Sequence, residues 1–143
     1  MTKTLFSLTL LFAFAGAVPA DDAANDLKKL VGTWEEVSHS EDGKAKSADE
    51  IKGVTVVIDE KGNWQALKDG TVIVKGSVKK LDPSKKPREA DWIVEGFDMP
   101  VLGIYEVKDD TWKHCFAVAK RPTEFASKEG SGVTYIVLKR VKK

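Results

Sequence analysis

Short β-prone segments, separated by turns too brief to hold a helix, constrain the fold of this chain most. Asp59-Glu60-Lys61-Gly62 and Lys68-Asp69-Gly70 divide residues 54–80 into three segments rich in β-branched residues. Connections this short join antiparallel neighbours, because a parallel crossover needs roughly a dozen residues or more. The segments predicted to be strands are residues 32–39, 54–58, 63–67, 71–80, 90–95, 102–107, 111–118 and 133–140.

Eight sequential antiparallel strands predict an all-β fold. They can close into an up-and-down barrel or pack as an open sandwich, and the strand count alone does not decide between them. A short helix carrying Leu27 and Leu30, capped by Asp21 or Asp22, is expected before the first strand. A single helical turn is expected at residues 48–51, with Ser47 as its cap.

The first 20 residues have the pattern of a signal peptide. Lys3 supplies a positive start, and the segment from Leu5 to Val18 is almost wholly apolar. The small residues Val18 and Ala20 predict cleavage after Ala20, because the apolar run is too short for a membrane anchor of about 20 residues. Residues 21–143 are therefore expected to form one domain in the periplasm or outside the cell, not attached to a membrane.

The charge pattern argues against a nucleic-acid partner. The chain has 23 basic and 22 acidic side chains, and Lys3 is the only one of them within the first 20 residues. The remaining charges therefore balance, whereas nucleic-acid binding usually needs a basic excess on one face. Cys115 is the single cysteine, so an internal disulfide is excluded.

Residues at the two ends of the strand series favour a closed barrel. Gly32-Thr33-Trp34 opens the first strand just after the expected helix, and Arg140 ends the last one. This pair resembles the lipocalin signature, a Gly-x-Trp on the first strand and an arginine near the chain end. The resemblance implies that Gly32, Trp34 and Arg140 form the structural closure, with the guanidinium lying across the indole. Such a contact stabilises a fold by about 0.5–2 kcal/mol.

Several longer stretches carry a narrower resemblance. They are residues 30–34 (LVGTW), 81–87 (LDPSKKP), 102–106 (LGIYE), 115–117 (CFA), 121–125 (RPTEF) and 130–132 (GSG). Together they resemble an uncharacterised lipocalin-like domain family of exported planctomycete proteins. The resemblance implies an eight-stranded lipocalin-like barrel with a short N-terminal helix, and it implies no established activity.

Strand alternation sorts the side chains by face. It groups Trp34 with Glu36 and Ser38 on the first strand. On the later strands it predicts the stripes Trp64 and Ala66; Val72, Val74, Gly76 and Val78; Trp92 and Val94; Trp112, His114 and Phe116. If these stripes point inward, the barrel holds four indoles.

The tryptophans support two hypotheses. In the first, Trp64, Trp92 and Trp112 line a hollow and bind a small apolar ligand. In the second, they fill the interior, and the barrel is a scaffold whose loops meet a protein partner of unknown identity. A cavity of about 300–1,000 Å³ within the barrel would favour the ligand carrier, and a filled interior would favour the scaffold.

No residue pattern predicts catalysis, a cofactor or a metal. His114 and Cys115 are adjacent on a strand, so they point to opposite faces and cannot bind one ion together. The chain has no phosphate-binding loop and no Gly-x-Ser-x-Gly motif. We therefore expect a non-catalytic protein.

The stretch Arg121 to Phe125 has two readings. Pro122 stiffens the backbone, which fits a rigid connector whose Phe125 packs against the barrel. The alternative places Arg121 and Glu124 as a polar gate at the barrel mouth. The anchoring role is the favoured one.

Overall fold

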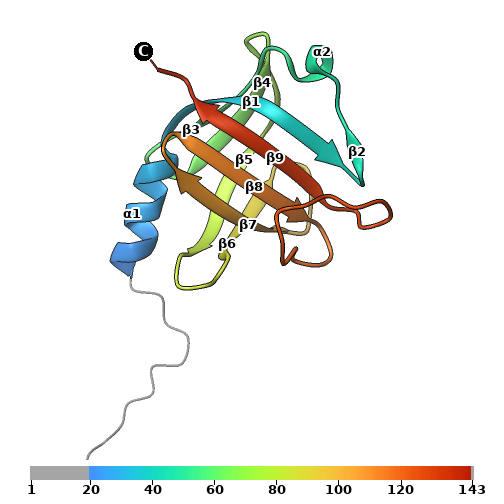
Figure 1. Cartoon of the computed structure of the whole chain (residues 1–143). Coiled ribbons are helices and arrows are strands. Elements are labelled where there is room, and N and C mark those ends of the chain that lie inside the picture. The colour runs from blue at the N-terminus through green and yellow to red at the C-terminus, as the bar shows by residue number, and fades with distance from the viewer. Residues whose placement is uncertain (1–19, 143) are drawn as a thin grey trace, which may run out of the picture.

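The computed structural model describes residues 20–142, and their nine strands form one antiparallel sheet that closes on itself (Figure 1). The predicted signal peptide falls on residues 1–20, of which 1–19 lie outside the described residues. The helices are α1 (Ala20–Leu30) and α2 (Ala48–Ile51). The strands are β1 (Gly32–Glu41), β2 (Lys44–Ala45), β3 (Val54–Ile58), β4 (Asn63–Lys68), β5 (Thr71–Asp82), β6 (Arg88–Val94), β7 (Val101–Lys108), β8 (Thr111–Ala117) and β9 (Thr134–Arg140).

The sheet closes because the first long strand pairs with the last. Strands β3 to β9 follow one another in sequence order, and β9 then pairs with β1 from Trp34↔Arg140 to Glu41↔Thr134. The predicted eight-stranded lipocalin-like barrel is therefore confirmed, and the open sandwich is wrong. The short strand β2, which pairs with the end of β1, was not predicted because it lies in a polar turn region.

The two ends of the barrel differ. Helix α1 lies at one end, which we call the helix end (Figure 1). Because the strands alternate in direction, the β3–β4, β5–β6 and β7–β8 connections share that end. Helix α2, the β4–β5 turn, the β6–β7 loop and the loop over residues 118–133 lie at the other, the loop end.

Bulges correct two of the predicted stripes. The pairing of β1 with β9 slips between Glu36 and Ser38, so His39, not Ser38, continues the row that contains Trp34 and Glu36. The pairing of β4 with β5 slips near Val72, which is exposed and leaves its predicted stripe. An extra residue shifts the two-residue period of a strand, and the sequence pattern carries no sign of it.

Glycines stand opposite aromatic residues inside the barrel. Trp64 pairs with Gly76, and Phe116 pairs with Gly103. A Cβ atom on Gly76 would lie 1.8 Å from the carbonyl oxygen of Ile93 and 2.8 Å from the Trp64 ring. The Ile93 backbone first, and the Trp64 ring after it, therefore occupy the space that a side chain at Gly76 would need.

Candidate functional site

The four tryptophans form one continuous row of rings inside the barrel, which we call the aromatic ladder. The ring centroids of Trp34 and Trp112 are 5.6 Å apart, those of Trp112 and Trp92 are 6.0 Å apart, and those of Trp92 and Trp64 are 6.5 Å apart. The structure thus brings together Trp64, Trp92 and Trp112, the three residues predicted to bind a ligand. Their spacing is typical of aromatic pairs in protein cores.

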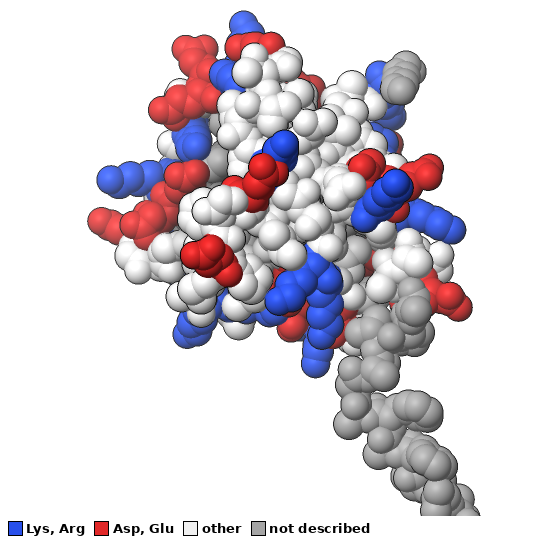
Figure 2. Space-filling view, turned by 180° about the vertical axis from the view of Figure 1, so that it is seen from behind, with Lys and Arg blue, Asp and Glu red and all other residues white. Residues whose placement is uncertain are grey.

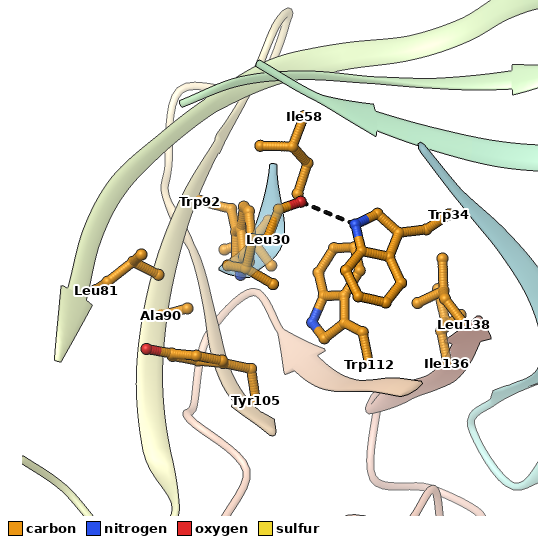
Figure 3. Close-up of a cluster of buried hydrophobic side chains, with 11 residues drawn as sticks. Leu30, Trp34, Ile58, Leu81, Ala90, Trp92, Tyr105, Trp112, Ile136 and Leu138 are labelled. Carbon is orange, nitrogen blue, oxygen red and sulfur yellow. Dashed lines mark hydrogen bonds between the residues drawn. The ribbon is translucent and has the colours of Figure 1, made fainter. Parts of the chain in front are cut away.

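The aromatic ladder is packed as core. Trp34, Trp92 and Trp112 are 0%, 4% and 2% exposed, and Trp64 is half-buried. Figure 3 shows Trp34, Trp92 and Trp112 among Leu30, Ile58 and other buried apolar side chains. A ring of this size buries about 150–250 Å², so these rings fill the interior at their level.

His114 extends the aromatic ladder toward the loop end. Its ring centroid lies 4.9 Å from that of Trp92, 5.3 Å from that of Trp112 and 4.6 Å from that of Phe116. Burial lowers the pKa of His114 to about 3, so the imidazole is neutral at ordinary pH. Cys115, the next residue, faces outward, as alternation requires.

Four buried nitrogen atoms of this group have no hydrogen-bond partner among the described residues. They are the Nε1 atoms of Trp64, Trp92 and Trp112 and the Nδ1 atom of His114. Trp34 differs, because its Nε1 donates to the Leu30 carbonyl at 2.8 Å. Leaving a buried polar group unpaired costs about 1–3 kcal/mol. These four atoms are therefore the polar groups of the ladder that the described residues leave without a hydrogen bond.

A chain of polar and charged side chains runs from the interior wall at β1, where Glu36 and His39 are largely buried, to the exposed side chains of Glu41 and Lys46. His39 Nδ1 lies 3.1 Å from Glu36 Oε2, and His39 Nε2 lies 2.9 Å from Glu41 Oε1. Lys46 Nζ is 3.2 Å from the same Glu41 oxygen. Burial lowers the pKa of His39, but hydrogen bonds and charge from Glu36 and Glu41 outweigh it and raise the pKa above 6.5. Sequence reasoning missed this chain because the bulge in β1 brings His39 onto the inner face.

The raised pKa of His39 predicts a pH-dependent contribution to stability. A group whose pKa is higher in the folded state stabilises the fold below its unfolded value, and that contribution is lost as the pH rises through the folded value. The stability difference between the wild type and His39→Gln is therefore expected to be largest near about pH 5.5 and to shrink by about pH 8.5. Urea unfolding at both pH values measures it. His114 is present in both proteins, so its titration changes both free energies of unfolding equally and does not affect their difference. A stability difference that grew as the pH rose would contradict the prediction.

The closure residues meet at the helix end. The Arg140 guanidinium carbon lies 4.3 Å from the centroid of the Trp34 ring. Arg140 also donates to the carbonyl oxygens of Val31 at 2.8 Å and Lys29 at 2.6 Å. A Cβ atom on Gly32 would lie 2.8 Å from Arg140 Nη1, so glycine leaves room for the guanidinium. Arg140 and Trp34 thereby satisfy carbonyl groups that the end of α1 leaves unpaired.

A second polar contact holds α1 against the barrel. Asp26 is buried and accepts hydrogen bonds from the Tyr105 hydroxyl at 2.6 Å and from Arg88 Nη1 at 2.8 and 3.0 Å. Burial and the carboxylate raise the pKa of Tyr105. Sequence reasoning missed this site, because its members lie on α1, β6 and β7 and no local motif links them. Its role is to fix the helix.

The loop over residues 118–133 covers the outer face of the barrel. Arg121 Nη1 donates to the Gly103 carbonyl at 2.9 Å, and Arg121 Nη2 lies 2.6 Å from Asp91 Oδ1. Glu124 pairs instead with Lys128 at 2.8 Å. Cys115 is fully buried beneath this loop. The predicted polar gate is therefore wrong, and Arg121 anchors the loop from outside.

Three concave regions lie on the outer surface of the described chain. One, of about 310 Å³, crosses β3, β4 and β5 beside Lys75 and Glu95. Two others, of about 290 and 310 Å³, lie on either side of Arg88 at the helix end. Trp64, the half-buried member of the aromatic ladder, is among the residues that line the first of these hollows.

Within residues 20–142, no three His, Cys, Asp or Glu side chains gather as a metal site would require. No helix in this range is long and apolar enough to cross a membrane.

The chain matches no family model, no curated protein and no solved structure. Its function is therefore inferred from its own geometry.

Proposed function

We propose that this protein is an exported, non-catalytic module with a filled barrel that binds a partner protein through its loops and outer surface. The observation that carries the proposal is the packing of the aromatic ladder, in which Trp34, Trp92 and Trp112 are at most 4% exposed. A carrier needs space beside its binding groups, and these rings occupy that space. The resemblance to exported lipocalin-like proteins supports the expectation of export.

The outer surface offers features for a protein partner. Ile73, Phe97 and Met99 are 60%, 63% and 58% exposed, and all three lie near the loop end. Figure 2 shows basic and acidic side chains interspersed around a mostly uncharged area on the back face. Aromatic residues and Met are enriched where proteins meet.

Site-specific photo-crosslinking tests this function. A photoreactive phenylalanine analogue is placed at Phe97 or Lys85 and, as a control, at Lys79 on the exposed side of β5. In the exported fraction of the native cell, we expect one discrete protein adduct from a loop position and none from Lys79. Equal labelling from all three positions, or none from any of them, would contradict the proposal.

A second candidate function is the small-molecule carrier. The unpaired nitrogen atoms of Trp64, Trp92, Trp112 and His114 favour it. A ligand with acceptor atoms would pair the three indole N–H donors, and the His114 Nδ1 atom donates or accepts according to its tautomer. Native mass spectrometry of the purified protein, with tryptophan fluorescence during ligand titration, separates the two functions. A retained small molecule that shifts the fluorescence would support the carrier. For the filled barrel we expect the mass of the protein alone and no change in tryptophan fluorescence during ligand titration.

A further inference from the structure

The cleft of about 290 Å³ at the helix end brings together segments that are far apart in sequence. Pro83, Lys85, Lys86 and Pro87 come from the β5–β6 loop, Glu106 from β7, and Phe125 from the loop over residues 118–133. We call it the proline cleft. These segments belong to three of the stretches on which the family resemblance rests. The cleft residues named here take no part in the aromatic ladder or in the closure by Gly32, Trp34 and Arg140.

Both walls of the proline cleft are held in place. Asp82 accepts hydrogen bonds from the Ser84 amide at 3.1 Å and from its hydroxyl at 2.5 Å, which fixes the start of the β5–β6 loop. Arg121 fixes the opposite wall through the Gly103 carbonyl and Asp91. A site that is already ordered avoids the entropy that binding would otherwise cost, about 0.5–1.5 kcal/mol per immobilised side chain.

The charges of the proline cleft are not balanced internally. Arg88, at its edge, is paired with Asp26. Lys85 and Lys86 form no ion pair with any of residues 20–142. Glu106 is the one acid among the residues that line the cleft, and the Asp82 carboxylate lies near enough to Lys85 for the lysine charge to help lower the pKa of Asp82. Two free cations between proline and phenylalanine walls complement a carboxylate attached to an apolar group. The volume is at the lower limit of small-molecule pockets, about 300 Å³.

We infer that the proline cleft binds an acidic side chain and its apolar neighbour on a partner protein. The inference rests on the proposed function, since it names one surface, separate from the exposed residues at the loop end, and the chemistry through which that function operates. Lys85 and Lys86 contact the carboxylate, and Pro83, Pro87 and Phe125 contact the apolar neighbour. The contact is weak by itself and adds to a larger interface.

Peptide titration with the full chain tests the inference. The probe is the blocked tripeptide acetyl-Phe-Glu-Glu-amide, its control is acetyl-Phe-Gln-Gln-amide, and two-dimensional amide NMR reports binding. We expect the acidic peptide alone to shift the amide signals of residues 84–86, 88 and 124–126. Two exposed ion pairs contribute about 0.2–1 kcal/mol each, so the double variant Lys85→Gln/Lys86→Gln should weaken binding by about fivefold.

A matched variant controls for net charge. Lys79→Gln/Lys80→Gln removes the same two charges from exposed positions of β5 outside the proline cleft, and less than about twofold weakening is expected. Equal weakening by both double variants, or equal binding of the neutral peptide, would overturn the inference. So would binding of free glutamate as tight as that of the peptide, since the site would then serve a small anion.

Crosslinking separates failure of this inference from failure of the proposed function. If a partner crosslinks to Phe97 but never to Lys85, the proposed function survives and the proline cleft is not its site. If the acidic peptide binds at Lys85 and Lys86 while no protein crosslinks at any position, the peptide chemistry is right and the proposed function is wrong. An adduct at Lys85 that Lys86→Gln weakens supports both.

Discussion

Replacing Trp112 with alanine is expected to lower the free energy of unfolding by about 3–5 kcal/mol, the range for truncating a buried tryptophan. Trp112 is 2% exposed and is the ring where the aromatic ladder and His114 meet. Its removal takes away contacts with Trp34, Trp92 and His114 together. The surrounding barrel wall is held by strand pairing and cannot collapse into the space, so a cavity should remain.

Urea unfolding followed by circular dichroism measures this loss. Phe97→Ala removes another large ring, but that ring is 63% exposed, and a change within about 0.5 kcal/mol is expected there. The loss in the free energy of unfolding for Trp112→Phe should lie between those for Trp112→Ala and Phe97→Ala. A loss below about 1 kcal/mol for Trp112→Ala would mean that the interior is loosely filled, and it would favour the carrier over the scaffold.

Replacing Arg140 with alanine is expected to cost about 2–4 kcal/mol. The guanidinium lies over Trp34, donates to the carbonyls of Val31 and Lys29, and pairs with Asp110 at 3.2 Å. A hydrogen bond to a charged group contributes about 1.5–3 kcal/mol, and the contact with the indole about 0.5–2 kcal/mol. Water can partly replace these hydrogen bonds after the substitution, so the sum is an upper limit.

Arg140→Lys distinguishes the shape of the guanidinium from its charge. Lysine keeps the charge but lacks the planar group that bonds two carbonyls at once, so it should recover less than half of the loss. Lys142→Ala, which removes an exposed neighbour of the same Asp110, should change stability little. Full stability in Arg140→Lys would show that a positive charge alone is sufficient at this position.

The sequence predicted most strands of the barrel because they are short β-prone segments separated by recognisable turns. Residues 54–58 were predicted with the bounds of β3, and the helical turn with its Ser47 cap is α2. The bulges were not predictable, since a slip of one residue depends on the neighbouring strand. They account for the errors at Ser38 and Val72.

The candidate site likewise has a part that the local sequence pattern predicted and a part that it did not. Alternation grouped Trp64, Trp92 and Trp112 each with neighbours on its own strand, and the structure brings the three rings into one row. Asp26 meets partners 62 and 79 positions away, at Arg88 and Tyr105. Contacts of that separation exist only after the barrel closes, so no spacing rule could reveal them. The same holds for the walls of the proline cleft.

The pairing of β1 with β9 also governs how the chain reaches its native state. The β3–β4–β5 and β7–β8–β9 pairs are local and should form early, whereas the partners of β1 on β9 are about a hundred residues away. The entropy of closing so long a loop delays this last step. Until then two strand edges are unprotected, and another copy of the chain can add to them. Refolding yield should therefore fall as protein concentration rises, with exchange of β9 between copies as the characteristic error.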